Sequence, residues 1–292
     1  MTAATPAPRS CTLGCVQLSP GGDRAINVDN AINGIRTAAR RGAMLVTLPE
    51  YATFLHASGR EMRSNALPEQ DDPALARFRD IAREEGVWIL VGSLALAAEG
   101  DRMSNRSLLL SAAGAIVARY DKLHMFDATL PGGRLIRESS AYTAGSRAVV
   151  AQTPWATLGM TICYDVRFPH LYRALSQAGA EILMVPSAFT KATGTLHWKS
   201  LLQSRAIENA AYVVAAATCG THPGGHQTYG HSMVVDPDGT IIAEAGDEPE
   251  VLVVEIDLAK VDKARSRIPS LTHDRAFELE HIHLAEVQHE QV

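Results

Sequence analysis

Three residues of different chemical type each come at the end of a strand-like apolar run. Cys163 follows Met160-Thr161-Ile162, and Glu50 and Lys122 each follow a similar run. In α/β proteins, ligands and catalysis gather beyond the ends of the strands. A thiol that attacks, a carboxylate that moves protons and an ammonium that stabilises negative charge would together form a hydrolytic site.

The position of Cys163 between a strand and a predicted helix favours the ionised thiol. A helix expected over 168–178 would direct the positive end of its dipole at the sulfur, and an ordinary thiol has a pKa of about 8.5. A thiolate there would be a competent nucleophile at neutral pH. The alternative is a buried cysteine that acts only as a small hydrophobic residue.

Short runs around these three residues resemble the glutamate, lysine and cysteine boxes of the nitrilase superfamily of carbon–nitrogen hydrolases. The runs are Leu48-Pro49-Glu50, Tyr120-Asp121-Lys122-Leu123-His124 and Ile162-Cys163-Tyr164-Asp165-Val166-Arg167-Phe168-Pro169. Their order and intervals also fit, from about residue 11 to about residue 275. Further runs resemble the Nit branch, which includes deaminated glutathione amidase and ω-amidase: Pro186-Ser187-Ala188-Phe189, His197-Trp198, 204–209 and 229–237.

The resemblance implies a role for each residue of the site. Cys163 would attack the amide carbonyl, and Glu50 would act as the general base and later as the acid. Lys122 would stabilise the oxyanion and keep the pKa of the thiol low. Glu138 matches a second glutamate that orients the lysine, although an exposed loop carboxylate is the alternative. The resemblance implies neither a metal nor an organic cofactor.

The expected substrate contacts lie near the cysteine and the lysine. Arg167 could bind a substrate carboxylate, or it could pair with Asp165 or Glu208. Phe189, Thr190 and Thr195 flank a glycine-containing segment, 191–194, that is expected to be a loop lining the cleft. The remaining candidates are Phe126 and Tyr164.

These expectations combine into a small-molecule hydrolase. The predicted enzyme cleaves a small carboxylate-bearing ω-amide, similar to deaminated glutathione, into a carboxylate and ammonia through a thioester. The alternatives within the superfamily are an N-carbamoyl amine hydrolase and a nitrilase. A non-catalytic binding or scaffold protein is an alternative of another class, and a redox protein built on Cys11 and Cys15 is a third. A strand would separate those two cysteines by about 13 Å, too far for a disulfide.

The composition indicates which partners and which cellular compartment are expected. The formal net charge of −5 argues against nucleic-acid binding, and no apolar run is long enough to span a bilayer. Four cysteines in 292 residues suit a reducing cytoplasm better than a disulfide framework. A metal site is not expected from the irregular spacing of the loop histidines His124, His222, His226 and His231, nor from the tail histidines His281, His283 and His289.

The chain alternates between predicted strands and helices, with hairpins between them. Strands are predicted at 11–19, 43–49, 87–96, two within 147–163, 181–186, 211–218 and 251–256; helices at 23–41, 73–85, 168–178, 196–210 and 258–267; hairpins at 106–120 and 231–244. The pattern predicts an α/β fold with mixed sheets, which the resemblance refines to a single-domain αββα sandwich. We expect a disordered segment 1–10, a hydrolase domain 11–275, and a tail 276–292 at the interface of a homodimer or higher homo-oligomer.

Overall fold

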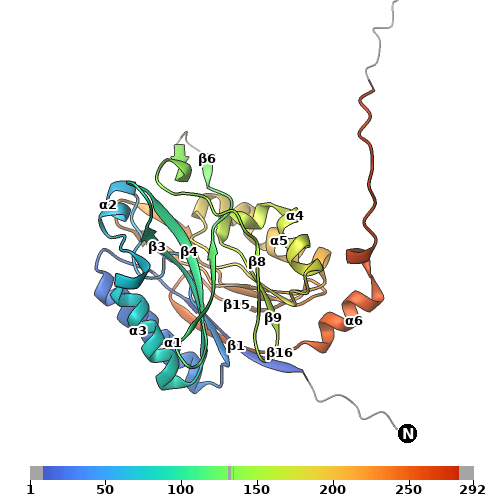
Figure 1. Cartoon of the computed structure of the whole chain (residues 1–292), viewed down its shortest axis with the longest axis horizontal. Helices are drawn as coiled ribbons and strands as arrows, with labels where there is room; N and C mark the ends of the chain where they lie inside the picture. The colour runs from blue at the N-terminus through green and yellow to red at the C-terminus, as the bar shows by residue number, and fades with distance from the viewer. Residues whose placement is uncertain (1–8, 131–132, 134, 283–292) are drawn as a thin grey trace, which may run out of the picture.

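Two six-stranded mixed sheets pack face to face in the computed structural model, which describes residues 9–130, 133 and 135–282 (Figure 1). The first sheet has the order β16-β1-β2-β3-β4-β5. Its strands are Ser10–Gln17 (β1), Leu45–Thr47 (β2), Trp88–Ala97 (β3), Met103–Leu110 (β4), Ile116–Asp121 (β5) and Glu250–Asp257 (β16). The central strands β1, β2 and β3 run parallel, and the flanking strands run antiparallel to their neighbours.

The second sheet repeats this arrangement in the order β15-β14-β11-β10-β9-β8. Its strands are Val149–Gln152 (β8), Thr157–Met160 (β9), Ile182–Met184 (β10), Tyr212–Ala215 (β11), Met233–Val235 (β14) and Ile241–Glu244 (β15). Strands β9, β10 and β11 are parallel to one another. Two small hairpins lie outside the sheets: Asp127–Thr129 (β6) with Leu135–Arg137 (β7), and Cys219–His222 (β12) with His226–Tyr229 (β13).

Helices cover the outer face of each sheet. Arg24–Arg40 (α1) and Pro73–Glu85 (α3) pack on the first sheet, and Pro169–Gln177 (α4) and Lys191–Asn209 (α5) pack on the second (Figure 1). The shorter helices are Gly59–Ser64 (α2) and Ala259–Arg267 (α6), and single 3-10 turns lie at Glu69–Asp71, Glu138–Ser140, Cys163–Arg167 and Ser270–Thr272. The side chains of Asp23 and Asp72 cap α1 and α3 by accepting backbone N–H bonds, which explains why the sequence marks these helices clearly.

The core follows from the alternation of side chains along the strands. In β3, Leu90 faces the second sheet, whereas Ile89 and Val91 face the helices on the outer side. All three side chains are fully buried, so both faces of the strand contribute to a core. A continuous apolar run therefore marks a strand buried on both sides, as expected for the centre of an αββα sandwich. The predicted fold class is confirmed.

Three features differ from the sequence-based expectation. Helix α5 begins at Lys191, not at 196, so the expected loop 191–194 is its first turn, with Thr190 as the N-cap. The hairpins β6–β7 and β12–β13 and the helix α2 were not predicted. Their strands have three or four residues and little hydrophobic alternation, and α2 has six residues, too few to show a helical period.

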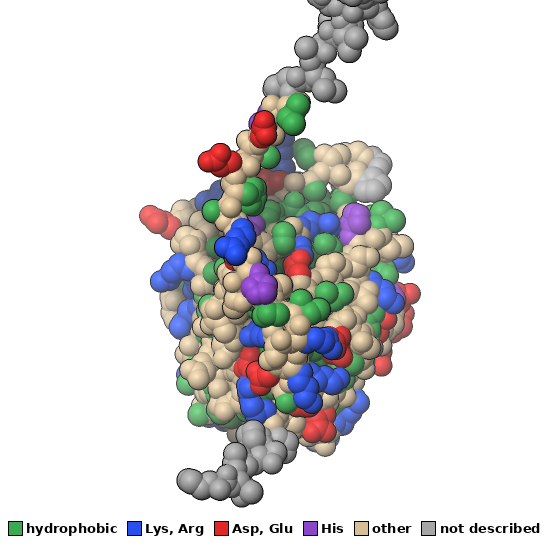
Figure 2. All heavy atoms as spheres, turned by 90° about the vertical axis from the view of Figure 1, so that its right-hand side faces the viewer, with side chains coloured by type: hydrophobic (Ala, Val, Ile, Leu, Met, Phe, Trp, Pro, Cys, Tyr) green, Lys and Arg blue, Asp and Glu red, His purple; other side chains and the backbone are tan. Residues whose placement is uncertain are grey.

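The two ends of the described chain behave differently. Ser10 already pairs with Asp257 in the first sheet, one residue before the expected start of the domain, while residues 1–8 lie outside the described part. After α6, Asp274 still pairs with Arg173 of α4, and residues 275–282 then leave the body of the protein as an exposed extension (Figures 1 and 2). His283 and His289 lie outside the described residues. In the described ranges, no helix combines the length and the apolar character that a membrane span requires.

Candidate active site

Glu50 lies three residues after the end of β2, where the chain passes very close to β3. A side chain at Gly92 would come within 2.0 Å of the Leu48 carbonyl oxygen, so only glycine lets the two backbones approach this closely. The next residue, Tyr51, has φ of 55° and donates its backbone N–H to Ser93. These contacts fix the direction of the Glu50 side chain, which is only 1% exposed.

Lys122 lies directly after β5 and is buried between two carboxylates. Its Nζ is 3.0 Å from Glu50 Oε1 and 2.9 Å from each carboxylate oxygen of Glu138. Burial acts to lower the pKa of Lys122, but the charges of Glu138 and Glu50 outweigh it and raise this pKa well above its usual value. The lysine is therefore a permanent cation at the centre of the site.

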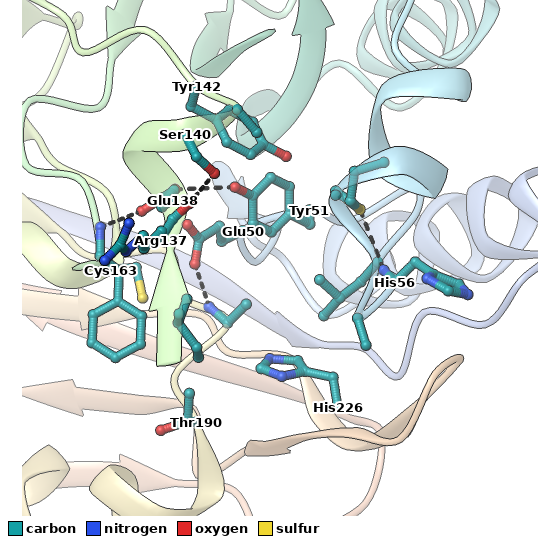
Figure 3. A pocket seen from close by; sticks show the side chains of 18 of the residues that line it. Glu50, Tyr51, His56, Arg137, Glu138, Ser140, Tyr142, Cys163, Thr190 and His226 are labelled. Atoms are coloured by element: carbon teal, nitrogen blue, oxygen red, sulfur yellow. Dashed lines mark hydrogen bonds between the residues drawn. The ribbon is translucent and has the colours of Figure 1, made fainter. Parts of the chain in front are cut away.

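Cys163 follows β9 and has left-handed backbone geometry, with φ of 49°. Its N–H donates to the Pro186 carbonyl oxygen at 2.9 Å, which ties the turn to the end of β10. An unfavourable φ in a non-glycine residue persists only where the surroundings enforce it, and such residues cluster at functional sites. The sulfur lines the same cavity as Glu50, Lys122 and Glu138 (Figure 3).

Glu138 is a buried partner of the lysine, not an exposed loop residue. It begins the 3-10 turn after β7, and its side chain is 8% exposed. Besides Lys122, its carboxylate accepts the N–H of Phe126 at 2.6 Å and the hydroxyl of Tyr51 at 3.2 Å. The alternative of a solvated carboxylate is therefore wrong.

Asn105 and Tyr51 complete the cluster, and neither was predicted from the sequence. The amide nitrogen of Asn105, in β4, lies 2.8 Å from Glu50 Oε1, 2.9 Å from the Tyr51 hydroxyl and 3.3 Å from Glu138 Oε1. A buried amide that donates to both carboxylates holds them at fixed positions around the lysine. No distinct signal marked Asn105, because it lies between Ser104 and Arg106-Ser107 in β4.

The electrostatic setting of Cys163 differs from the expectation. Burial and the neighbouring charge of Glu50 raise the pKa of the thiol well above its usual value, and Lys122 only partly opposes this. The expected lowering of the pKa by Lys122 and a helix dipole is therefore wrong for the unliganded protein. Glu50 also accepts the N–H of Ala188 at 2.7 Å, and its negative charge acts on the thiol. The resting state pairs a neutral thiol with an adjacent carboxylate, which can remove its proton.

The expected substrate contacts gather on one side of Cys163, with one exception. A recess of about 20 Å3 is lined by Cys163 and by Phe126, Tyr164, Arg167, Phe189 and three neighbours. Thr195 lies elsewhere: it is exposed on α5 and donates its hydroxyl to the Lys191 carbonyl oxygen. The early start of α5 turns it away, so the expectation for Thr195 is wrong. Thr190, which was expected beside the cleft, and Thr193 of the 191–194 segment do line the recess.

Arg167 has no carboxylate partner among the described residues. Both alternatives for its pairing are wrong, because Asp165 binds His124 and Tyr120, and Glu208 pairs with Arg205. The guanidinium instead lies 5.2 Å from the ring centre of Phe189, and desolvation lowers its pKa. A half-buried cation without a counter-ion suits an anionic substrate group.

The histidines and the other cysteines have structural contacts. His124 stacks on Phe168 and contacts Asp165, His222 contacts Thr228, and His231 contacts Asp247. Among the side chains that the structure describes, no three histidine, cysteine or carboxylate groups are arranged to hold a metal ion. Cys11 and Cys15 are buried free thiols on β1, and burial raises the pKa of each to about 12, which does not suit a redox pair.

Known proteins share both the sequence and this architecture. The carbon–nitrogen hydrolase family profile matches residues 12–266. A deaminated glutathione amidase from Yersinia enterocolitica is 44% identical over 238 residues, which are 80% of this chain and 82% of that protein. The crystal structure of Saccharomyces cerevisiae Nit3, a member of branch 10 of the nitrilase superfamily, superposes with a TM-score of 0.83 at 29% identity, covering 94% of this chain and all of Nit3.

A further solved structure bears on the site itself. It is a variant of the amidase from Nesterenkonia sp. AN1 with the acetamide moiety of fluoroacetamide added covalently at its active-site cysteine. The TM-score is 0.76 at 26% identity, covering 92% of this chain and 98% of that one. The family profile and the relatives named as amidases support an enzyme and argue against the alternative of a non-catalytic scaffold protein. The chain belongs to the carbon–nitrogen hydrolase family, in the nitrilase superfamily, and is a hydrolase of carbon–nitrogen bonds.

Proposed function

We propose that this protein is a cysteine-dependent amidase that acts on small carboxylate-bearing ω-amides such as deaminated glutathione. The observation that carries the proposal is the convergence of Cys163, Glu50, Lys122 and Glu138 on one cavity, next to a recess in which Arg167 lacks a counter-ion. The thiol and the carboxylate provide the chemistry of amide cleavage. Arg167 provides the attraction for a carboxylate on the acyl portion of the substrate.

The first half of the reaction forms a thioester. Glu50 takes the proton of the Cys163 thiol as the sulfur attacks the carbonyl carbon, and the carbonyl π electrons move to the oxygen. Lys122 and the backbone N–H after Cys163 stabilise the resulting oxyanion. Glu50 then gives its proton to the nitrogen, the C–N bond breaks, and the amine leaves.

The second half regenerates the enzyme. Glu50 removes a proton from a water molecule whose oxygen attacks the thioester carbon. As the tetrahedral species collapses, the C–S bond breaks and the sulfur recovers the proton from Glu50. The products are a carboxylic acid and an amine, and the net reaction consumes one water molecule. Glu138 and Asn105 are positioning residues in this scheme because they hold Lys122 and Glu50 at their observed distances.

The identity of the released amine depends on the substrate. A primary ω-amide releases ammonia. In deaminated glutathione the corresponding amide nitrogen belongs to cysteinylglycine, so its cleavage releases that dipeptide. Both reactions use the same four side chains and differ only in the group that leaves from the Glu50 side of the carbonyl.

The proposal is tested by turnover of an ω-amide panel and by the mass of the acid-quenched protein. We expect release of amine from carboxylate-bearing ω-amides and an acyl adduct that Cys163→Ala lacks. Cys163→Ser should lose about 1,000-fold or more in kcat while keeping its circular dichroism spectrum, because an alcohol is far less acidic than a thiol. Near-normal turnover by Cys163→Ser would disprove cysteine catalysis. Turnover of nitriles or N-carbamoyl amines in place of every ω-amide would disprove the substrate class.

We also propose that the enzyme works in the reducing cytoplasm as a homodimer or larger homo-oligomer. All four cysteines are free and buried, which suits a compartment that keeps thiols reduced. Oxidation of Cys163 would remove the nucleophile, so activity measured with and without a thiol reductant checks the first part. The homo-oligomer is tested by deletion of the C-terminal tail and measurement of the mass in solution.

A further inference from the structure

The cavity that holds the catalytic cluster is much larger than the nitrogen of a primary amide requires. It encloses about 380 Å3, whereas the recess on the Arg167 side of Cys163 encloses about 20 Å3. Beyond the charged cluster, much of its wall is apolar: Leu55, Ala57, Met62, Leu135, Ile136 and Ala141. A substrate group of considerable size therefore fits on this side of the nucleophile.

Glu50 indicates which part of the substrate occupies the larger cavity. Cys163 lines both spaces, but Glu50 lines only the larger one. In the proposed mechanism, Glu50 protonates the departing nitrogen, so the nitrogen and its substituent must lie on the Glu50 side. The acyl portion then extends toward Arg167. The larger cavity thus receives the amine that leaves.

Arg137 contributes a positive charge to the wall of this cavity. It is the last residue of β7, lines the cavity, and forms no ion pair with any carboxylate among the described residues. Its partner in the β6–β7 ladder, Asp127, accepts the N–H of Ser139 at 3.0 Å. The neighbouring Glu138 is committed to Lys122 at 2.9 Å. The charge of Arg137 also helps to lower the pKa of Asp127, but the two groups form no ion pair, so the guanidinium can still bind a ligand.

The position of Arg137 is coupled to the catalytic cluster through the backbone. Glu138, the next residue, binds Lys122 and the N–H of Phe126, so the base of the β6–β7 hairpin is anchored at the site. Figure 3 shows Arg137 beside Glu138 on one side of the cavity, with His56 and His226 on other sides. The guanidinium and the Cys163 sulfur thus face the same cavity.

We propose that Arg137 binds a carboxylate on the amine portion of the substrate and so selects N-substituted ω-amides whose leaving group is an amino acid or a short peptide. This inference rests on the proposed function. Two arginines that form no ion pair with any described carboxylate, Arg167 for the acyl portion and Arg137 for the leaving amine, match a substrate with a carboxylate at each end. Deaminated glutathione has this form, since its 2-oxo acid and its glycine carboxylate lie on opposite sides of the scissile amide.

The test compares two substrates with the same acyl group. The first is 2-oxoglutarate joined through its ω-carboxyl to the amine of alanylglycine, and the second is the same compound with its C-terminal carboxylate converted to an amide. The wild-type enzyme should prefer the acid by about tenfold in kcat/KM, mainly through KM. In Arg137→Gln this ratio should fall to near one. Arg137→Lys keeps the charge but loses the bidentate fork, so its ratio should be intermediate.

Control variants separate this role from general effects. Arg60 is exposed on α2 beside the cavity but does not line it, so Arg60→Gln should keep the wild-type ratio. Arg167→Gln should lower kcat/KM for both substrates by a similar factor. A wild-type ratio near one, or an unchanged ratio in Arg137→Gln, would overturn the inference while turnover of the two amides still supported the proposed function. Failure of the wild type to cleave either amide would overturn both.

Discussion

In the proposed mechanism, the carboxylate that activates the Cys163 thiol also protects it at rest. Its pKa is raised because burial disfavours the thiolate and Glu50 places a negative charge beside it. The sulfur therefore stays neutral until a substrate carbonyl offers a place for the charge, next to Lys122. A nucleophile of this kind depends on a general base at the moment of attack, and not on a standing population of thiolate.

This arrangement predicts that Glu50→Gln lowers the thiol pKa while it abolishes turnover. Replacing the carboxylate removes a negative charge that raises the pKa, so the thiolate should appear at lower pH than in the wild type. Turnover should fall by at least about 100-fold because no base remains. Ultraviolet absorbance of the thiolate across a pH titration checks the shift. Subtracting the Cys163→Ala titration removes Cys11, Cys15 and Cys219, and an unchanged or higher midpoint would contradict the electrostatic account.

Asn105 provides a second test of charge balance in the cluster. Asn105→Asp keeps the shape but adds a third carboxylate beside Glu50 and Glu138, with Lys122 as the cation between them. The new carboxyl should have a raised pKa in the folded state, so its destabilisation is absent below the unfolded pKa of about 3.9 and grows as pH rises above it. At neutral pH we expect a loss of about 3 kcal/mol or more.

Chemical denaturation at acidic and neutral pH measures this dependence. Asn105→Ala removes the same hydrogen bonds without adding charge. Its loss of folding stability should therefore not increase between acidic and neutral pH as that of Asn105→Asp does. Equal pH profiles for the two variants would show that charge crowding in the cluster is not the cause.

At the scale of elements, Asp165 joins the turn that carries Cys163 to the end of the strand that carries Lys122. Its fully buried carboxylate accepts the hydroxyl of Tyr120 at 2.6 Å and the backbone N–H groups of Ile162 at 2.9 Å and His124 at 3.1 Å. Tyr120 lies in β5, two residues before Lys122, and His124 lies two residues after Lys122. One side chain thus sets the spacing between the second sheet and the first at the catalytic centre.

Asp165→Asn should therefore weaken both the fold and the chemistry. The amide of asparagine has only one oxygen that accepts hydrogen bonds. Its NH2 group would face an N–H or O–H that now donates to the carboxylate, and this clash should destabilise the fold by about 3 kcal/mol or more at a buried site. We expect a lower midpoint of urea unfolding and at least about a tenfold loss in kcat. Tyr120→Phe removes one of these bonds, so its loss should be near 1 kcal/mol. An Asp165→Asn enzyme with normal stability and kcat would show that this carboxylate does not position the nucleophile.

The sequence indicated the candidate catalytic residues because each lies near the end of a strand. Glu50 and Cys163 follow runs that are almost wholly buried, whereas Lys122 follows β5, an edge strand in which Val117 is 49% exposed. Asn105 was missed because Ser104, Arg106 and Ser107 surround it in β4, so polarity alone does not distinguish it. Arg137 and Thr195 depend on short elements, the β6–β7 hairpin and the first turn of α5, whose boundaries are set by tertiary contacts and capping rather than by hydrophobic period. The raised thiol pKa was missed because burial depends on the whole fold.

At the scale of the whole molecule, the described tail is difficult to explain as part of a monomer. Residues 273–282 have no regular secondary structure, and Phe277, Leu279 and Ile282 are 87%, 76% and 78% exposed. Leu196 on α5 is also 67% exposed. Figure 2 views the face of the molecule past which this tail runs, with hydrophobic side chains among the charged ones. Large apolar side chains exposed together are typical of a surface that a partner covers.

We expect the chain to form at least a homodimer, with twice the 31.4 kDa mass of one chain, through contacts that include this tail. Deletion of residues 276–292 should shift the assembly toward monomer, because the described part of the tail, 276–282, is exposed along its length and must gain its apolar contacts from another copy. Leu196→Glu should weaken the assembly if α5 shares the surface. Ile26→Glu changes an exposed apolar residue on α1, which covers the first sheet, and should leave the mass unchanged.

Light scattering after size-exclusion chromatography, over a range of concentrations, measures these masses. A wild-type protein that stays monomeric, or a deletion variant with the wild-type mass at every concentration, would show that the tail does not hold copies together.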